Sequence, residues 1–174
     1  MANKKIRQIA EEIKLVIFDF DGVFTDNKVI VHEDGSESVV CNRADGIGLS
    51  RLRQLGIDLL ILSTEQNEVI KYRARKLNIN CINNCVNKLD RLLSEIKKRK
   101  LSLNQVAFVG NDINDLECLK IVGFPVVVAN SHRDVLRYGK YKTRLSGGNG
   151  AVREVCDFIA SVLREGGKFD AQSF

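Results

Sequence analysis

The chain has 174 residues, of which 44% are apolar and 28% are charged. This length allows one domain with a well-developed core, and the composition excludes an intrinsically disordered chain. No apolar run is long enough to span a bilayer and the N-terminus has no signal-peptide pattern, so we expect a cytoplasmic protein without a membrane partner.

The net charge of +5 raises the question of nucleic-acid binding. The basic residues are scattered, however, and the densest groups, at residues 97–100 and 73–76, fit the polar faces of helices. No aromatic residues are interleaved with them as stacking platforms. We therefore expect no nucleic-acid partner, and a basic surface that attracts anionic metabolites is equally compatible with the charge.

Five cysteines are present, without a CxxC pair. The spacing of Cys81 and Cys85 would suit a metal, but no second Cys/His pair accompanies them. Reduced, buried or half-buried thiols are the better interpretation.

Short β-branched runs alternate with longer helical patterns along the chain. The first run, residues 13–18, is almost continuously apolar, which is typical of a strand buried on both faces. An Asp-Gly turn then lies between residues 29–31 and 39–40 and predicts a hairpin. The later elements are, in order, helix 49–55, strand 57–62, helix 68–77, strand 79–82, helix 89–100, strand 106–109, helix 116–122, strand 126–128 and helices 134–138 and 152–163.

This alternation predicts an α/β fold: a Rossmann-like, doubly wound parallel sheet covered by helices on both faces. The hairpin forms a small flap after the first strand, and no large cap domain is expected. We predict a single domain over residues 1–174, with the flap at 28–41 and a glycine-rich segment, last helix and tail at 147–174. Ligands of such sheets bind outside the carboxyl ends of the strands, so the functional residues should directly follow strands.

The first strand is followed by Asp19 and Asp21, two carboxylates at i and i+2, and Gly22 then lets the backbone turn sharply. A carboxylate at a strand tip can attack phosphorus while its neighbour transfers protons. An acidic cluster directly after a buried strand is costly unless it meets a cation. An ordinary acidic loop is the alternative interpretation.

Polar groups also follow the other strands. Ser63 and Thr64 can hydrogen-bond a phosphoryl oxygen, although such residues often cap helices. Lys88 can neutralise phosphate charge. Residues 110–115, Gly-Asn-Asp-Ile-Asn-Asp, supply the oxygen atoms that complete a magnesium site. Each feature alone has a simpler explanation, but the four together indicate a phosphate site with Mg²⁺.

The set DxDGV, then Ser/Thr, then Lys, then GNDxxD resembles the haloacid dehalogenase superfamily of phosphotransferases over nearly the whole chain. The hairpin without a larger cap resembles its capless branch. Residues 147–156, Gly-Gly-Asn-Gly-Ala-Val-Arg-Glu-Val-Cys, resemble the tail of the 3-deoxy-D-manno-octulosonate 8-phosphate phosphatases. Close relatives of that family are the 2-keto-3-deoxynononate 9-phosphate phosphatases and the C-terminal domain of acylneuraminate cytidylyltransferases.

The resemblance implies a phosphomonoester hydrolase that acts through an aspartyl-phosphate intermediate. Asp19 would be the nucleophile, and Asp21 would protonate the leaving sugar oxygen and then deprotonate the attacking water. Ser63 or Thr64, together with Lys88, would hold the phosphoryl oxygens.

The resemblance also implies Mg²⁺ bound by the Asp19 carboxylate and the Asp21 carbonyl oxygen. Where the family usually has Asp after the motif glycine, this chain has Asn111. An amide oxygen can ligate Mg²⁺ but brings no charge, so the affinity should fall. Asp112 is the alternative ligand, and Asp115 could hold the metal ligands in place without binding Mg²⁺ itself.

Members of the capless branch form tetramers in which a neighbour's hairpin and tail close the site, so a homotetramer is expected. The segment containing Asp45 and Gly46 would contribute to the substrate site. Arg73 is a candidate for gripping the sugar carboxylate, because guanidinium matches a carboxylate in bidentate fashion. A solvated helix arginine is the alternative.

The identity of the sugar is open. Octulosonate phosphatases more often have Thr-Gly-Arg where this chain has Ser63, Thr64 and Glu65, and Glu65 with Lys76 resembles the nononate branch. The tail favours the octulosonate branch and hence lipopolysaccharide biosynthesis. We expect a 3-deoxy-2-ulosonic acid phosphate, with octulosonate 8-phosphate preferred over nononate or acylneuraminate 9-phosphate.

Two functions of other classes are the alternatives. One is a catalytically weakened tetramerisation module like the cytidylyltransferase C-terminal domain. The other is a receiver-like phosphoacceptor, against which the first-strand position of Asp19 argues.

Overall fold

The computed structural model describes residues 2–165. Its helices are α1 (Ala2–Glu11), α2 (Ala44–Gln54), α3 (Val69–Leu77), α4 (Lys88–Lys98), α5 (Leu116–Ile121), α6 (Arg133–Leu136) and α7 (Ala151–Glu165), with 3-10 turns η1 (Leu103–Gln105) and η2 (Ile113–Asp115). Its strands are β1 (Leu15–Phe18), β2 (Ile30–Val31), β3 (Glu37–Ser38), β4 (Asp58–Leu62), β5 (Asn80–Ile82), β6 (Val106–Gly110), β7 (Phe124–Val127) and β8 (Tyr141–Lys142).

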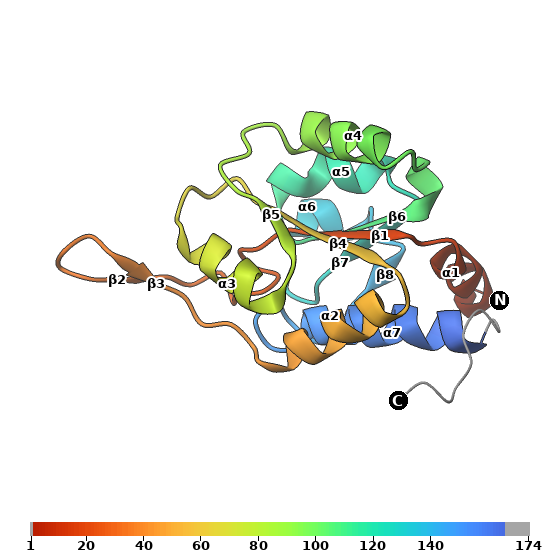
Figure 1. Ribbon diagram of the computed structural model, residues 1–174, viewed down its shortest axis with the longest axis horizontal. Helices are drawn as coiled ribbons and strands as arrows, with labels where there is room; N and C mark the ends of the chain where they lie inside the picture. Colours follow the sequence, from red (N-terminus) through yellow and green to blue (C-terminus); the bar gives the residue numbers. More distant parts are fainter. Residues whose placement is uncertain (1, 166–174) are drawn as a thin grey trace.

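The main sheet has the strand order β5-β4-β1-β6-β7-β8, and every pairing in it is parallel (Figure 1). β1 lies between β4 and β6, with Val16 opposite Leu59 on one side and Ala107 on the other. All four of its residues are buried, as the apolar run predicted. The chain winds outward from β1 in both directions, so β1 and its neighbours form the topological switch point.

Helices cover both faces of this sheet, with α4, α5 and α6 on one side and α2 and α7 on the other (Figure 1). Because successive strand side chains point to opposite faces, Leu15 and Ile17 pack into the core beneath α4 and α5. Val16 and Phe18 pack into the core beneath α2, α3 and α7. The predicted doubly wound α/β fold is confirmed.

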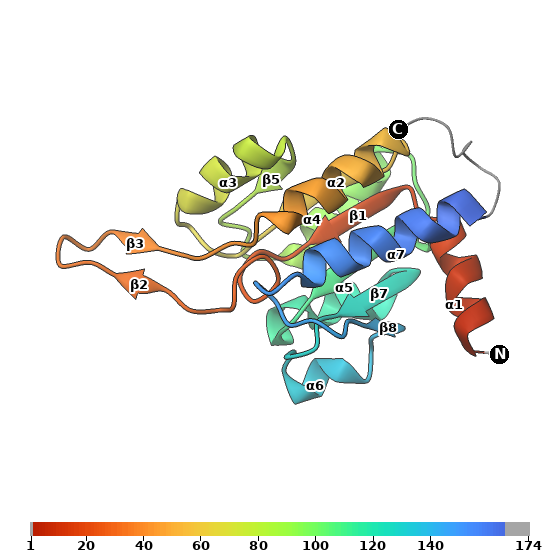
Figure 2. The same cartoon turned by 90° about the horizontal axis from the view of Figure 1, so that it is seen from below.

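A two-stranded hairpin, β2 and β3, follows β1 and projects away from the sheet (Figures 1 and 2). Its turn is tighter than predicted, since His32 N donates to Ser36 O and Gly35, at φ +80°, reverses the chain. Residues 37–38 therefore pair with 30–31, and the prediction of 39–40 as the second strand is wrong. Val39 packs instead against the main core.

α1 and β8 were not predicted from the sequence, and α2 begins five residues earlier than expected. α1 carries few apolar residues; Ile6, Ile9 and Ala10 pack against the main core, beside α7. A helix this short is stabilised mainly by such packing and not by its own propensity. No helix within residues 2–165 has the length and apolarity needed to traverse a lipid bilayer.

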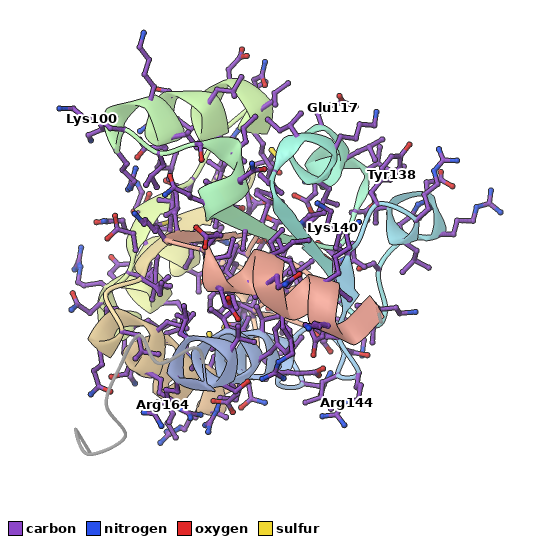
Figure 3. All side chains as sticks on the ribbon, turned by 90° about the vertical axis from the view of Figure 1, so that its right-hand side faces the viewer. Lys100, Glu117, Tyr138, Lys140, Arg144 and Arg164 are labelled. Atoms are coloured by element: carbon purple, nitrogen blue, oxygen red, sulfur yellow. The ribbon has the colours of Figure 1, made fainter. Side chains whose placement is uncertain are left out.

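Charged side chains are distributed around the surface. On the face seen from the α1 end, Lys100, Arg144 and Arg164 lie at separate edges (Figure 3). The labelled basic side chains are thus spread over this face (Figure 3).

Candidate active site

Three adjacent strands bring the predicted residues together. Asp19 follows β1, Ser63 follows β4 and Asn111 follows β6, and the carboxyl ends of parallel strands share one edge of the sheet. Asp19 N still donates to Val109 O at 2.9 Å, so the β1–β6 ladder holds the nucleophile candidate. A cavity of about 260 Å³ opens here, lined by Asp19, Asp21, Asn27, Ser63, Thr64, Asn111, Asp112 and Asn114.

Lys88 is the buried cation of the site. It is the first residue of α4, and its Nζ lies 2.8 Å from Asp19 Oδ1 and 2.7 Å from Asp115 Oδ1. Burial acts to lower the pKa of Lys88, but the carboxylates of Asp19 and Asp115 outweigh it and hold that pKa above its ordinary value. The ammonium group is therefore charged and fixed beside the nucleophile.

Asp19 is buried, and burial together with the charge of Asp115 raises its pKa to about 7, although Lys88 acts in the opposite direction. Its Oδ1 also accepts a hydrogen bond from Phe20 N at 2.7 Å. Its Oδ2 lies 3.3 Å from a polar atom of the Asn111 amide, and that atom lies 3.0 Å from the main-chain oxygen of Asp21. A cation at that position would favour the ionised, nucleophilic form of Asp19.

Asp21 is partly exposed at the mouth of the cavity. Burial, and then the charge of Glu65, raise the pKa of Asp21, while the hydroxyl of Thr25 acts to lower it. Thr25 Oγ1 lies 3.5 Å from Asp21 Oδ1. A carboxyl group with a raised pKa is suited to donate a proton and to take it back in a later step.

The loop that carries both aspartates depends on two glycines. Gly22 has φ +79°, and a Cβ on it would lie 2.0 Å from the Asn111 amide. Gly147 packs directly on this loop, because a Cβ there would lie 1.8 Å from Gly22 O. The glycine-rich segment thus supports the DxDG loop, a contact that could not be predicted from the sequence. Residues 166–174 of the predicted tail lie outside the described residues.

The oxygen atoms at the cavity fit a divalent cation. One polar atom of the Asn111 amide lies 3.3 Å from Asp19 Oδ2 and 3.0 Å from Asp21 O. Cis ligands of an octahedral Mg²⁺ ion with bonds of about 2.1 Å are separated by about 3 Å. Residues 2–165 contain no cluster of three or more His, Cys, Asp or Glu side chains that could hold a metal. Of the three candidate ligands at this cavity, only Asp19 offers a carboxylate; the other two are the Asp21 main-chain carbonyl and the Asn111 amide.

Asp112 and Asp115 have distinct positions. Asp112 lines the cavity, and its Oδ1 accepts from Ile113 N at 2.7 Å as the cap of η2. Asp115 is fully buried, and its Oδ2 accepts from Asn111 N at 2.8 Å while its Oδ1 binds Lys88. Asp115 therefore connects the Asn111 loop to the buried lysine.

A second cavity of about 260 Å³ adjoins the first beside Asp21 and is lined by Glu65, Glu37 and Asn67, among others. Asn67 Nδ2 donates to Glu37 Oε2 at 2.9 Å and so ties the hairpin to the loop before α3. Asn27, Glu37 and Asn67 are not among the site residues predicted from the sequence. Only the fold brings them beside Asp21, because they belong to three separate segments.

Arg73, Asp45 and Gly46 do not line either cavity. Arg73 Nη2 donates to Asn42 O at 2.8 Å, and Asp45 is 1% exposed at the contact between α2 and α7. Gly46 lines a separate surface groove beside Ile47. Their roles as substrate ligands stay predictions.

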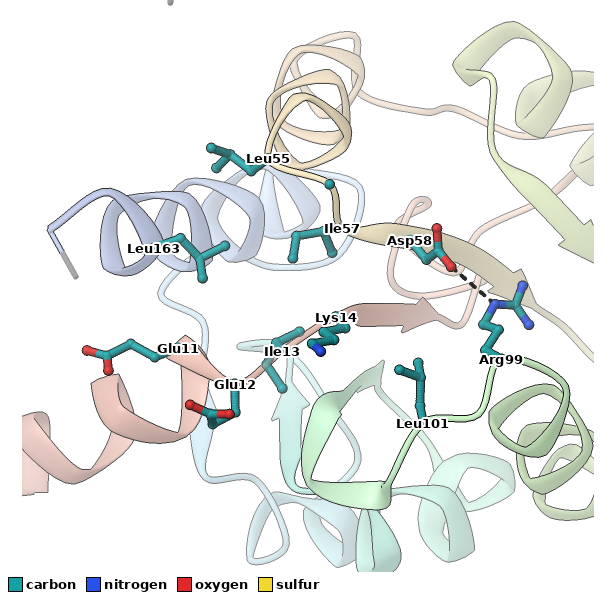
Figure 4. Close-up of a pocket in the computed structure, with 11 residues that line it drawn as sticks. Glu11, Glu12, Ile13, Lys14, Leu55, Ile57, Asp58, Arg99, Leu101 and Leu163 are labelled. Atoms are coloured by element: carbon teal, nitrogen blue, oxygen red, sulfur yellow. Dashed lines mark ion pairs between the residues drawn. The ribbon is translucent and has the colours of Figure 1, made fainter. Parts of the chain in front are cut away.

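Another cavity, of about 450 Å³, lies at the amino ends of β1 and β4, where Lys14 and Asp58 are among its lining residues (Figure 4). Arg99 Nε lies 3.5 Å from Asp58 Oδ2 there. None of the predicted catalytic or metal-binding residues lines this cavity.

Comparison with known proteins gives consistent results. Residues 55–154 match the family described as haloacid dehalogenase-like hydrolase. The chain is 33% identical to 3-deoxy-D-manno-octulosonate 8-phosphate phosphatase KdsC of Escherichia coli (strain K12) over 162 residues, which are 92% of this chain and 85% of that protein.

Two solved structures are also similar. The 3-deoxy-D-manno-octulosonate 8-phosphate phosphatase from Moraxella catarrhalis, in complex with magnesium, phosphate and KDO, superposes with a TM-score of 0.90 at 34% identity, covering 95% of this chain and 96% of that one. A HAD family hydrolase from Streptomyces avermitilis gives a TM-score of 0.85 at 42% identity, covering 88% and 95%.

Proposed function

Because the chain belongs to the haloacid dehalogenase-like hydrolases, and among them to the 3-deoxy-D-manno-octulosonate 8-phosphate phosphatase family, we propose that it hydrolyses 3-deoxy-D-manno-octulosonate 8-phosphate. It is a phosphatase, and Mg²⁺ is its cofactor. Nononate or acylneuraminate 9-phosphate is the alternative substrate of the same class. The observation that carries the proposal is the position of Asp19, which has Lys88 Nζ 2.8 Å from one carboxylate oxygen and the Asn111 amide 3.3 Å from the other.

In the first step Asp19 forms a bond to phosphorus as the bond from phosphorus to the sugar oxygen breaks, and Asp21 protonates that leaving oxygen. In the second step Asp21 takes a proton from water, which attacks the aspartyl-phosphate and releases inorganic phosphate. Ser63, Thr64 and Lys88 hold the phosphoryl oxygens, where fixed positive charge and hydrogen bonds stabilise the transition state. A raised pKa of Asp21 supports this double role.

Asp19, the Asp21 carbonyl and Asn111 would hold Mg²⁺, with Asp112 as the alternative to Asn111. The cation supplies charge that screens the repulsion between the Asp19 carboxylate and the phosphate. Asp115 positions Asn111, because Asp115 Oδ2 accepts a hydrogen bond of 2.8 Å from the backbone N–H of Asn111.

The sugar would occupy the second cavity beside Asp21, where Glu65 offers an acceptor for sugar hydroxyls. Arg73 and Asp45 are kept as further substrate contacts. In their support, Arg73 Nε and Asp45 Oδ1 are buried without a hydrogen-bond partner among the described residues. Gly46 is kept with them as a proposed contact, although it lines a separate groove beside Ile47 and not the cavity proposed for the sugar.

We further propose a single domain over residues 1–174 and a homotetramer whose neighbouring hairpin, residues 28–41, closes the site. Exposed apolar side chains on that hairpin support the second point, since Ile30 and Val31 are 56% and 65% exposed. A cytoplasmic location is proposed from the family.

The test is phosphate release by the purified protein with Mg²⁺, measured side by side on octulosonate 8-phosphate and nononate 9-phosphate. We expect faster turnover of octulosonate 8-phosphate and a loss of roughly 10³-fold or more in Asp19→Asn, which removes the nucleophile. Asp58→Asn is the matched control, because Asp58 is exposed at the opposite edge of the sheet.

Release from nononate 9-phosphate alone would assign the alternative substrate. No release from either compound at millimolar Mg²⁺ would instead favour the tetramerisation module. Against that module, Asp19, Asp21 and Lys88 are all present at the cavity or its buried wall.

A further inference from the structure

The Asn111 amide group is held in one place. The backbone N–H of Asn111 donates to Asp115 Oδ2 at 2.8 Å, and the backbone carbonyl of Asn111 accepts from His132 N at 2.8 Å. The side chain packs over Gly22, where a Cβ would come within 2.0 Å of the amide. The amide therefore stays against the DxDG loop, and the freedom left to it is a half-turn that exchanges its oxygen and nitrogen.

The two orientations of the amide, which differ by this half-turn, suit different partners. The amide atom that faces Asp19 Oδ2, at 3.3 Å, and Asp21 O, at 3.0 Å, meets two hydrogen-bond acceptors. With Asp19 ionised and no cation present, the atom in this position is Nδ2, because an oxygen there would face two hydrogen-bond acceptors with no proton between them. With a divalent cation among the three atoms, it must be Oδ1.

We propose that Asn111 is a two-state ligand: its amide nitrogen bridges Asp19 and the Asp21 carbonyl in the metal-free protein, and the amide rotates to present oxygen when the divalent cation binds. This inference deepens the proposed function, since it concerns the metal of the same site. The two acceptors stay where the cation needs them, so the metal-free site is already assembled.

An aspartate at this position would behave differently. Its carboxylate would have no N–H to offer, and it would add a negative charge at the position that lies 3.3 Å from Asp19 Oδ2. A site with that residue would depend on the cation to hold its ligands together. Asn111 lets the protein keep the geometry without the cation, and the cation must break two hydrogen bonds to bind, which lowers its affinity.

The direct test observes the Asn111 amide by NMR in protein labelled with ¹⁵N-asparagine, the signal being assigned by its loss in Asn111→Ala. We expect amide protons that exchange slowly with solvent in metal-free protein, and that shift and exchange faster when Mg²⁺ is added. Fast exchange in the metal-free protein, or a signal indifferent to Mg²⁺, would overturn the proposal. Neither readout requires turnover, so loss of the proposed phosphatase activity would be seen separately.

A second measurement uses Asn111→Asp with Asn114→Asp as matched control. Asn114 lines the same cavity, so its substitution adds the same charge without removing the amide that faces Asp19. We expect Asn111→Asp to lower the Mg²⁺ dissociation constant by roughly tenfold or more through the added ligand charge. Its melting temperature without Mg²⁺ should fall, and the rise on adding Mg²⁺ should exceed that of the wild type and of the control. Equal behaviour of the two variants would contradict the two-state role.

Discussion

At the scale of single residues, the site is built around the buried ammonium group of Lys88. Lys88 Nζ contacts both Asp19 and Asp115. Without the ammonium group, these two buried carboxylates would have no positive charge to balance them. A buried ion pair adds little net stability, but removing one partner is strongly destabilising. Lys88 thus serves both the folded state and the proposed chemistry.

Lys88→Met should therefore lose stability and activity together. We expect the free energy of unfolding to fall by about 3–5 kcal/mol, because the two carboxylates are left unpaired. Phosphate release should fall by roughly 10²-fold or more, since the charge that holds the phosphoryl oxygens is gone. Urea unfolding and steady-state kinetics measure the two effects. Lys98→Met, at an exposed position of the same helix, is the control, and a wild-type rate in Lys88→Met would refute the assigned role.

At the scale of elements, α2 and α7 pack closely beside the site. Gly48 makes this approach possible, because a Cβ there would lie 2.8 Å from the Cβ of Cys156. Asp45 is buried at the same contact, near the backbone of Arg153 in the first turn of α7. Burial raises the pKa of Asp45 to about 6, although the Arg153 backbone and the charge of Arg73 act to lower it.

This pKa has a consequence for stability as the pH changes. A carboxyl group whose pKa is higher in the folded than in the unfolded protein costs stability as the pH rises. The cost begins near the unfolded value of 3.8 and is complete above about 6, where the folded carboxyl is ionised. The shift corresponds to about 3 kcal/mol.

Asp45→Asn should remove this cost, because the amide carries no charge at any pH. We expect the variant to be more stable than the wild type by about 2–3 kcal/mol at pH 8 and close to it at pH 4. Denaturant unfolding across this range measures the difference. A difference in stability that does not change with pH would show that Asp45 is ionised equally in both states.

At the scale of the whole molecule, the hairpin is the part that the sheet does not support (Figure 2). Four of its apolar side chains are exposed on a projecting two-stranded element: Val29, Ile30, Val31 and Val40. A lone hairpin with exposed apolar residues is marginal in water and is stabilised by contacts with other chains. Its position beside Asp21 connects assembly to the proposed site.

The double variant Ile30→Thr/Val31→Thr should weaken association while it keeps the β-branched shape that strands favour. We expect the proposed homotetramer to give way to smaller species in sedimentation equilibrium, with a raised KM where a neighbour's hairpin closes the site. Val86→Thr changes an exposed apolar residue outside the hairpin and should leave the assembly intact. A monomeric wild type would rule out the proposed assembly.

The sequence by itself determined the alternation of strands and helices and, through it, the edge of the sheet at which Asp19, Ser63 and Asn111 meet. Those predictions depend on hydrophobic periodicity and on the order of residues, which are local properties of the chain. The same local reading failed for α1 and for the register of the hairpin. α1 is held by its packing beside α7, and the hairpin register is set by a turn at Gly35.

Only the tertiary structure decided which groups touch. Three contacts join segments that are distant in the sequence. Lys88 binds both Asp19 and Asp115. Gly147 supports the DxDG loop, and Asn67 holds Glu37 beside Asp21. It likewise placed Arg73 and Asp45 away from the two cavities beside Asp21 and aimed the Asn111 amide at Asp19. The physical reason is that hydrogen bonds and ion pairs act over a few ångströms, and packing alone sets which side chains come that close.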